Sequence, residues 1–248
     1  MNKVGFLLLI PMVWGQSADE IAQKAQDRTL SKSEHYVGTL QVVDAHRKVS
    51  EKRWIFDRIG AHGNSKSILR FTSPPEVKGV ALLVVNHPDR ASDQWMWTPA
   101  LERDRRIALQ DRSARFFGTD FSFEDLEERD VGQFSYGLLG DESMAGQACW
   151  KLESRPKQTK DSQYTSSQLW IRKDNYVIIH IDHYKKQNVV RRIEYNDVQD
   201  VQGIWTPKTL EITDVQRNSR TVMKIEELRY NLPMQDSDFT VEALRHAR

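Results

Sequence analysis

Cysteine is nearly absent from this sequence, and long apolar runs are confined to its first residues. Cys149 is the only cysteine among 248 residues, so no internal disulfide can form and stability must come from a buried core. A lone cysteine in the strand-like segment ACWKLES is more often a small buried apolar residue than a nucleophile. After residue 18 no stretch approaches the roughly 20 apolar residues of a membrane helix, which predicts a soluble mature chain.

Glycine-rich phosphate loops are also missing. Neither GxxxxGK[ST] nor GxGxxG occurs, which argues against nucleotide-dependent chemistry, and we predict no cofactor. GxSxG is absent too, so nucleophilic hydrolysis has no local support. Neither sign of charge is in excess, because 36 Lys and Arg nearly balance 35 Asp and Glu. The whole molecule therefore offers no field that would favour nucleic acid, and any charged partner must meet a local patch.

The N-terminus has the pattern of an export signal. Lys3 precedes an apolar run from Val4 to Trp14, and small or polar residues follow at Gly15 to Ala18. This pattern is typical of a secretory signal peptide, here residues 1–17, and a short N-terminal helix is the alternative interpretation. No cysteine lies near the cleavage region to accept a lipid. We predict a periplasmic protein in a bacterial source, with residues 18–248 as a single domain.

Past the leader the hydrophobic period indicates one helix and then many strands. Residues 19–34 are rich in helix formers and predict a weakly amphipathic helix with Ile21, Ala22, Ala25 and Thr29 on one face. From Tyr36 the period becomes two, which is typical of half-buried strands. The alternating apolar residues of the first strands are Leu40, Val42, Trp54, Phe56, Leu69 and Phe71.

Later segments continue the strand pattern. Residues 79–86 (GVALLVVN) are apolar on both faces and predict a strand that is covered on each side. DQWMWTP and RDRRIAL predict a hairpin around Pro99. From ACWKLES to RTVMKIEELRY, short strand-like runs alternate with polar turns. Even spacing of short strands is typical of an antiparallel sandwich or barrel.

Residues 110–128 (QDRSARFFGTDFSFEDLEE), which we call the lid segment, break the strand rhythm. Ser122 followed by Asp125 resembles a capped helix start, and aromatic residues cluster just before it. Four phenylalanines occur here: Phe116, Phe117, Phe121 and Phe123. We predict an internal lid with a helix.

Two groups of polar residues could carry chemistry, and each has a structural interpretation. His180, Asp182 and His183 could bind a metal, but alternation places His183 on the opposite face from the other two. An outward polar row on a strand whose inward row is Val177, Ile179 and Ile181 is favoured, and we predict no metal site. Asp120, Glu124 and Asp125 could act as acid and base, but acidic residues at a helix start also complement the helix dipole.

A basic row is the most concentrated charge feature of the sequence. One interpretation of this row is a solvated strand whose arginines pair with neighbouring carboxylates. The other, equally favoured, is a binding surface for lipid phosphates or for an acidic partner. Its members are Arg103, Arg105, Arg106, Arg112 and Arg115.

The segment WMWTPALERDRRIALQDRSARFFGTDFSFEDL resembles the outer-membrane lipoprotein-sorting protein family, the LolA-like periplasmic carriers. Supporting matches are PPEVKGVALLV (residues 74–84) and GIWTPKTLEI (residues 203–212), so the resemblance covers most of the mature chain. It implies a mainly β fold with a few helices: a curved antiparallel sheet forming an incomplete, half-open barrel covered by helices, as in LolA and LolB. Such carriers shield acyl chains in transit, and many are associated with RND-type exporters.

The resemblance implies roles for specific side chains. The basic row above would serve headgroup or partner docking. The wall and lid of a lipid site would be formed by Leu40, Val42, Trp54, Phe56, Leu69, Phe71, Leu83, Trp95, Trp97, Phe116, Phe117, Phe121 and Phe123.

The function we expect is a chaperone-like transport protein that carries lipoprotein or lipid acyl chains between inner and outer membranes, with transient membrane contact and no covalent catalysis. Burial of each methylene is worth about 0.8 kcal/mol, so an exposed long chain costs roughly 10 kcal/mol. Two alternatives stay open. One is an accessory module that docks on an RND-type inner-membrane transporter and carries no lipid; the other is a hydrolase that uses the region from Asp120 to Asp125.

Overall fold

The fold is seen in a computed structural model, which describes residues 15–29, 31–61 and 63–246. Within them one α-helix, α1 (Ala18–Asp27), precedes thirteen strands. The strands are β1 (Ser33–Val43), β2 (Val49–Ala61), β3 (Asn64–Ser73), β4 (Ala81–Val85), β5 (Asp93–Thr98), β6 (Arg103–Ile107), β7 (Phe134–Met144), β8 (Gln147–Pro156), β9 (Ser166–Arg172), β10 (Ile178–Lys185), β11 (Asn188–Val201), β12 (Ile204–Asp214) and β13 (Ser219–Tyr230).

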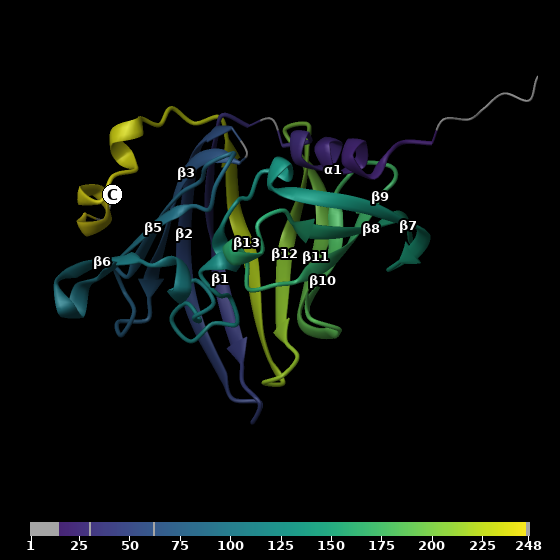
Figure 1. Cartoon of the computed structure of the whole chain (residues 1–248). Coiled ribbons are helices and arrows are strands. Elements are labelled where there is room, and N and C mark those ends of the chain that lie inside the picture. The colour runs from purple at the N-terminus through teal and green to yellow at the C-terminus, as the bar shows by residue number, and fades with distance from the viewer. Residues whose placement is uncertain (1–14, 30, 62, 247–248) are drawn as a thin grey trace, which may run out of the picture.

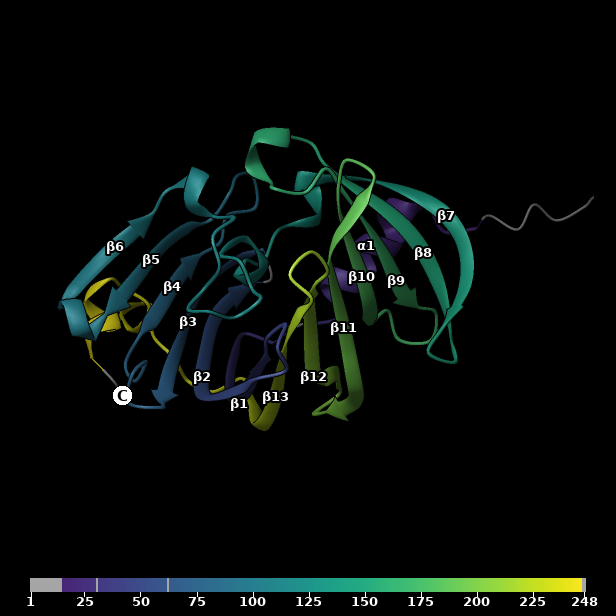
Figure 2. The ribbon, with the colours of Figure 1, turned by 90° about the horizontal axis from the view of Figure 1, so that it is seen from below.

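All thirteen strands belong to one antiparallel sheet that curves like a half pipe (Figures 1 and 2). The order is β6-β5-β4-β3-β2-β1-β13-β12-β11-β10-β9-β8-β7, so β6 and β7 are the edges and the sheet does not close. Each neighbour is adjacent in sequence except β1 and β13, which pair at the centre. The prediction of a half-open antiparallel barrel is confirmed.

Helix α1 is shorter than predicted. Ser17 caps it by accepting a hydrogen bond from the backbone N–H of Glu20, while the Glu20 carboxylate accepts one from the N–H of Ser17. Ile21, Ala22 and Ala25 are buried against β8 and β9, as the helical period requires. The helix ends at Asp27, however, and residues from Ser33 onward lie in β1. At Ser33 and Glu34 the helical composition is overridden by pairing with β2.

The main core lies on the concave face of the sheet and includes the lid segment. Leu40, Trp54, Phe71 and Leu82 from the sheet pack with Phe116, Phe121 and Phe123 of the lid segment. Phe71 stacks on Phe116 with ring centroids 5.3 Å apart. In Figure 2 the lid segment runs through the hollow of the sheet, and α1 lies beside β9 and β10. One α-helix and a loop-like segment, rather than several helices, therefore cover the concave face.

The lid segment does not form the predicted helix. Ser122 and Asp125 make the expected reciprocal contacts: the N–H of Ser122 donates to Asp125 Oδ2 over 2.7 Å, and the N–H of Asp125 donates to Ser122 Oγ over 3.3 Å. Only a 3₁₀ turn, Glu124–Leu126, follows them. Side chains of this segment are committed to contacts with the sheet, which stops the turn from propagating as a helix.

Strand β4 is covered on both faces, as predicted. Leu82 and Val84 belong to the concave core, whereas Ala81 and Leu83 face the convex side with Phe239 and Leu244 of the C-terminal segment. Trp95 and Trp97 of β5 pair with Leu83 and Ala81 of β4, respectively. Leu83, Trp95 and Trp97 therefore lie on the convex face, and their predicted place in the concave wall is wrong. A strand that is apolar on both faces gives no sign of which side is concave.

A register shift between Ile178 and His180 changes the predicted inward row of β10. Ile178 and Ile181 face the helix side, whereas Val177 and Ile179 pack with Cys149 and Trp170 on the convex side. The single extra residue explains why simple alternation misplaced Val177 and Ile179. Cys149 itself is a buried free thiol, as predicted.

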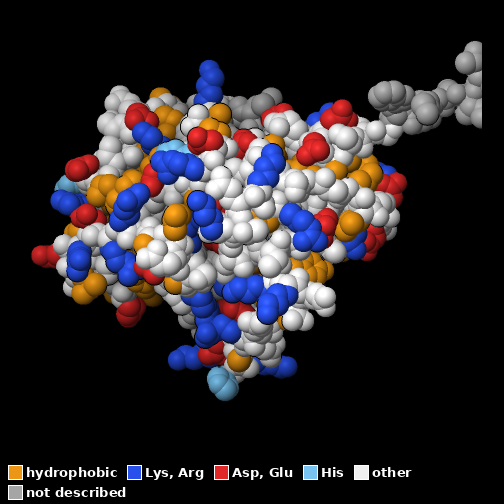
Figure 3. Space-filling model, in the orientation of Figure 1, with side chains coloured by type: hydrophobic (Ala, Val, Ile, Leu, Met, Phe, Trp, Pro, Cys, Tyr) orange, Lys and Arg blue, Asp and Glu red, His pale blue; other side chains and the backbone are white. Residues whose placement is uncertain are grey.

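The face in Figure 3 carries basic, acidic and apolar side chains side by side, in keeping with the near-zero net charge. Among the described residues, no helix has the length and apolar character to cross a bilayer. Residues 1–14, most of the predicted signal peptide, lie outside the described residues.

Candidate functional site

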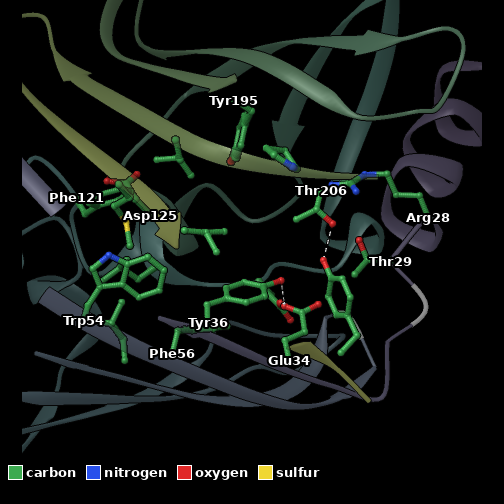
Figure 4. A pocket seen from close by; sticks show the side chains of 18 residues that line it. Arg28, Thr29, Glu34, Tyr36, Trp54, Phe56, Phe121, Asp125, Tyr195 and Thr206 are labelled. Atoms are coloured by element: carbon green, nitrogen blue, oxygen red, sulfur yellow. Dashed lines mark hydrogen bonds between the residues drawn. The ribbon is translucent and has the colours of Figure 1, made fainter. Parts of the chain in front are cut away.

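A cavity of about 300 Å³ lies between the concave face of the sheet and the lid segment. β1, β2, β3, β11, β12 and β13 supply its walls, and residues 121–128 of the lid segment close it. The volume falls at the small end of the range typical of ligand-binding pockets. Figure 4 shows the side chains that surround it.

The cavity is apolar at one end and polar at the other. The cross-strand pairs show how these residues follow one another along the strands. Met223 pairs with Leu40 and Leu210, Phe56 pairs with Tyr36, and Tyr230 pairs with Glu34. The apolar end is formed by Trp54, Phe56, Leu69, Leu210, Met223 and Ile225. The polar end is formed by Arg28, Thr29, Glu34, Tyr36, Thr206 and Tyr230. In Figure 4, Trp54 and Phe121 lie at one side of the view and Arg28 and Thr29 at the other.

A second hollow, of about 430 Å³, lies under α1. Ala22 and Ala25 of α1 face Leu169, Ile171 and Ile181 across it. Five residues line both hollows: Arg28, Thr29, Asp125, Glu128 and Tyr195. The two hollows are therefore adjacent, and movement of these side chains would join them into one channel along the concave face.

Buried ion pairs hold the lid segment against the sheet. Asp125 pairs with Arg191 of β11, and Glu128 lies 3.3 Å from the Nε of Arg58 in β2. Arg58 also donates to Glu34 over 2.7 Å. Burial by itself would raise the pKa of Glu34, but hydrogen bonds from Arg58, Tyr36 and Ser31 hold that pKa below its usual value. The lid segment is thus latched by charge at its C-terminal end.

Asp120 provides a third anchor. It is fully buried and accepts hydrogen bonds from Ser219 Oγ (2.5 Å), Thr221 Oγ1 (2.8 Å) and Arg115 Nη2 (2.7 Å). Asp125 likewise accepts from Tyr164 Oη over 2.6 Å. Glu124, the third acid or base candidate, accepts from Ser162 Oγ over 2.5 Å and from the N–H of Gln163 over 2.8 Å. All three carboxylates therefore have structural partners that account for their burial.

In the structure the predicted basic row falls into two groups, exposed arginines and arginines that form ion pairs within the lid segment. Arg103, Arg105 and Arg106 are exposed on edge strand β6. Arg112 is buried and pairs with Glu127, and Arg115 pairs with Asp120. The prediction of a docking role is wrong for Arg112 and Arg115, because their guanidinium groups are already bound within the lid segment.

The predicted apolar wall is also divided. Trp54, Phe56, Leu69 and Phe121 line the cavity. The other concave residues fill the packed core instead: Leu40, Val42, Phe71, Phe116, Phe117 and Phe123. Sequence reasoning missed Leu210, Met223 and Ile225, although their period-two spacing in β12 and β13 marks them as one face of the sheet.

His183 faces the second hollow, on the opposite face of β10 from His180 and Asp182, as alternation predicted. Its Nδ1 lies 2.6 Å from Ser167 Oγ, and its ring stacks on Tyr164 at 4.2 Å. His180 and Asp182 form a convex-side contact in which Asp182 also accepts from Arg192 over 2.9 Å. Among the described residues, no group of three or more His, Cys, Asp and Glu is arranged to hold a metal ion.

His183 makes stability sensitive to acid. Burial lowers the pKa of its imidazole from 6.5 to about 4. The unfolded chain therefore binds this proton at higher pH than the folded protein, and stability falls as pH drops from about 6.5 to about 4, by about 3 kcal/mol. Urea unfolding of wild type and His183→Gln across this window would show a loss that is larger in wild type by about 3 kcal/mol. His46→Gln, at an exposed turn, is the control, and parallel curves for wild type and His183→Gln would contradict the expectation.

Comparisons with known proteins agree with this architecture. A family model described as that of an uncharacterized protein matches residues 63–246. No curated protein matches the sequence. A solved structure described as an outer membrane lipoprotein-sorting protein domain, from Vibrio parahaemolyticus, is 26% identical, with a TM-score of 0.87 over 92% of this chain and 98% of that one.

Two further solved structures are similar. A DUF1329 family protein from Desulfovibrio piger is 26% identical, with a TM-score of 0.87 over 92% of this chain and 97% of its own. A LolA superfamily protein from Nitrosomonas europaea shares the fold at 19% identity, with a TM-score of 0.73 over 92% of this chain and 100% of that chain. The family model spans well over half of the sequence, so the chain belongs to that family, and its fold is the LolA-like fold that the motif between Trp95 and Asp125 led us to expect.

Proposed function

We propose that this protein is a periplasmic carrier that shields an acyl chain of a lipid or lipoprotein between the inner and outer membranes, without covalent chemistry. The observation that supports this most is the half-apolar cavity closed by a latched segment. Each methylene that leaves water for such a site contributes about 0.8 kcal/mol. Reversible burial alone therefore supplies enough free energy to hold a chain and still release it to an acceptor that binds it better.

Loading and release require the lid segment to move. Its charged end, at Asp125 and Glu128, lies between the two hollows, and its partners Arg191 and Arg58 belong to the sheet. A membrane or partner protein that competes for these arginines would favour the open state, because a ligand shifts an equilibrium only through its differential affinity for the two states. The exposed arginines of β6 offer a surface for such an encounter.

The test is native mass spectrometry of gently purified protein, with lipid extraction of the same sample. We expect bound acyl species in wild type and their loss in Met223→Glu, which places a charge at the apolar end of the cavity. Lys224→Glu is the matched control, because the neighbouring side chain is exposed on the other face of β13. Circular dichroism establishes that each variant is folded, and Met223→Gln is a gentler second variant.

Empty protein in every preparation, together with no uptake of added lipid, would contradict the carrier proposal. Equal lipid content in Met223→Glu and Lys224→Glu would place the lipid outside this cavity. Trp97, a natural target on sequence grounds, is unsuitable as a probe because it lies under the C-terminal segment on the convex face.

A further inference from the structure

Arg28 lines the cavity and differs from Arg58 and Arg191, which pair with the carboxylates around it. It follows α1 and reaches toward Thr206 at the polar end (Figure 4). Its Nη1 donates to the backbone carbonyl oxygen of Trp205 over 2.6 Å, and its buried Nε has no hydrogen-bond partner among the described residues. A buried donor without an acceptor is costly, so this group is expected to have a ligand in the working protein.

The carboxylates around the cavity do not fill this role. Glu34 and Glu128 are both bound by Arg58, and Asp125 is bound by Arg191. Among the described residues, none of these carboxylates makes an ion pair with Arg28. Burial lowers the pKa of Arg28, in keeping with a half-buried guanidinium that has no contacting anion among the described residues.

Other groups at this end could assist Arg28. Tyr230 Oη lies 2.6 Å from Thr206 Oγ1, and Tyr36 Oη donates to Glu34 over 2.6 Å. Thr29 lines the cavity beside Arg28 (Figure 4). Hydroxyl groups next to a guanidinium suit an oxygen-rich anion, because an arginine fork binds carboxylate and phosphate through directed hydrogen bonds.

We propose that the cavity binds a single-chain amphiphile with an anionic head, in which Arg28 contacts a carboxylate or phosphate and the acyl chain lies toward Trp54, Leu210 and Met223. This inference rests on the carrier function and names its cargo class. A volume of about 300 Å³ favours one chain over several in the closed state.

Isothermal titration of delipidated protein at neutral pH tests the proposal. The probes share one chain and differ in the head: myristate, myristoyl lysophosphatidylglycerol, the uncharged monomyristoylglycerol, and inorganic phosphate without a chain. We expect the two anionic amphiphiles to bind about tenfold more tightly than monomyristoylglycerol, as one charged hydrogen-bonded contact allows. Inorganic phosphate should show no competition at matched concentration, and the stronger of the two anionic probes identifies the head chemistry.

Variants of Arg28 separate recognition from folding. Arg28→Gln should lower the affinity for the anionic probes about tenfold, to the level of monomyristoylglycerol, whose own affinity stays within about twofold. Arg28→Lys keeps the charge and should retain part of the preference. Arg53→Gln removes an exposed arginine of β2 and is the control.

Three results would overturn the inference. Equal binding of anionic and uncharged probes by wild type would leave the carrier function intact and remove the headgroup site. A parallel loss of all probes in Arg28→Gln would give Arg28 a purely structural role. Competition by inorganic phosphate would indicate a free-anion site. Failure of every acyl probe to bind would instead contradict the carrier function itself.

Discussion

Replacing Arg58 by methionine is expected to lower the free energy of unfolding by about 3–5 kcal/mol, because it leaves buried carboxylates without their counter-charge. Arg58 is fully buried. It donates to Glu34 over 2.7 Å and to Ser31 Oγ over 2.8 Å, and it lies 3.3 Å from Glu128 of the lid segment. One side chain thus joins β2, β1 and the lid segment.

Arg53→Met provides the control for this prediction. Arg53 lies on the same strand, but its ion pair with Glu226 is exposed, with 46% and 42% of the two side-chain surfaces accessible. Exposed pairs contribute about 0–1 kcal/mol, so this variant should unfold almost like wild type. Urea unfolding followed by tryptophan fluorescence measures both. Similar midpoints for Arg58→Met and Arg53→Met would show that the buried network adds no net stability.

Phe116→Ala is expected to cost about 3–5 kcal/mol, the usual range for truncating a fully buried aromatic residue. Its ring is 1% exposed and packs against Phe71, Phe117 and Phe123, with centroids 5.3, 5.6 and 5.8 Å away. This half of the lid segment is therefore part of the core. A loss of that size would make Phe116 an anchor that stays in place while the rest of the lid segment opens.

Phe117→Ala is the matched comparison. The neighbouring ring is only half-buried, and its backbone adopts a left-handed conformation with φ of 42°. Truncation there should cost about 1 kcal/mol, the value of its aromatic pairings. Thermal unfolding monitored by circular dichroism distinguishes the two variants. A loss below about 1 kcal/mol for Phe116→Ala would mean that the lid segment contributes little to the core and can detach as a whole.

Sequence patterns predicted the fold well because period-two alternation depends on local burial. Leu40 and Val42 of β1 alternate with Thr39 and Gln41, and the two apolar side chains lie in the concave core. Strand β7 escaped prediction, because Gly137 and Gly140 interrupt it and Leu138 and Leu139 are exposed. An edge strand that buries little has no clear apolar alternation to detect.

The site was less predictable, because its key contacts join residues that are distant in sequence. Asp125 meets Arg191 66 positions away, and Glu128 meets Arg58 across the hollow of the sheet. No local pattern indicates which of the 36 basic residues will be buried against which carboxylate. Face assignment failed at Leu83 for a related reason: both faces of β4 are apolar, so only the tertiary structure decides which one is concave.

The central pairing of β1 with β13 has a consequence for how the chain folds during synthesis. Every other pairing joins consecutive strands and can form early as a local hairpin. The pairing of β1 with β13, for example of Glu34 with Tyr230, cannot form until β13 has been synthesised. Two separate meanders, β1–β6 and β7–β13, are therefore made before the middle of the sheet exists. Until residue 230 is synthesised, the open side of β1 is an unpaired edge at which association with another chain would begin.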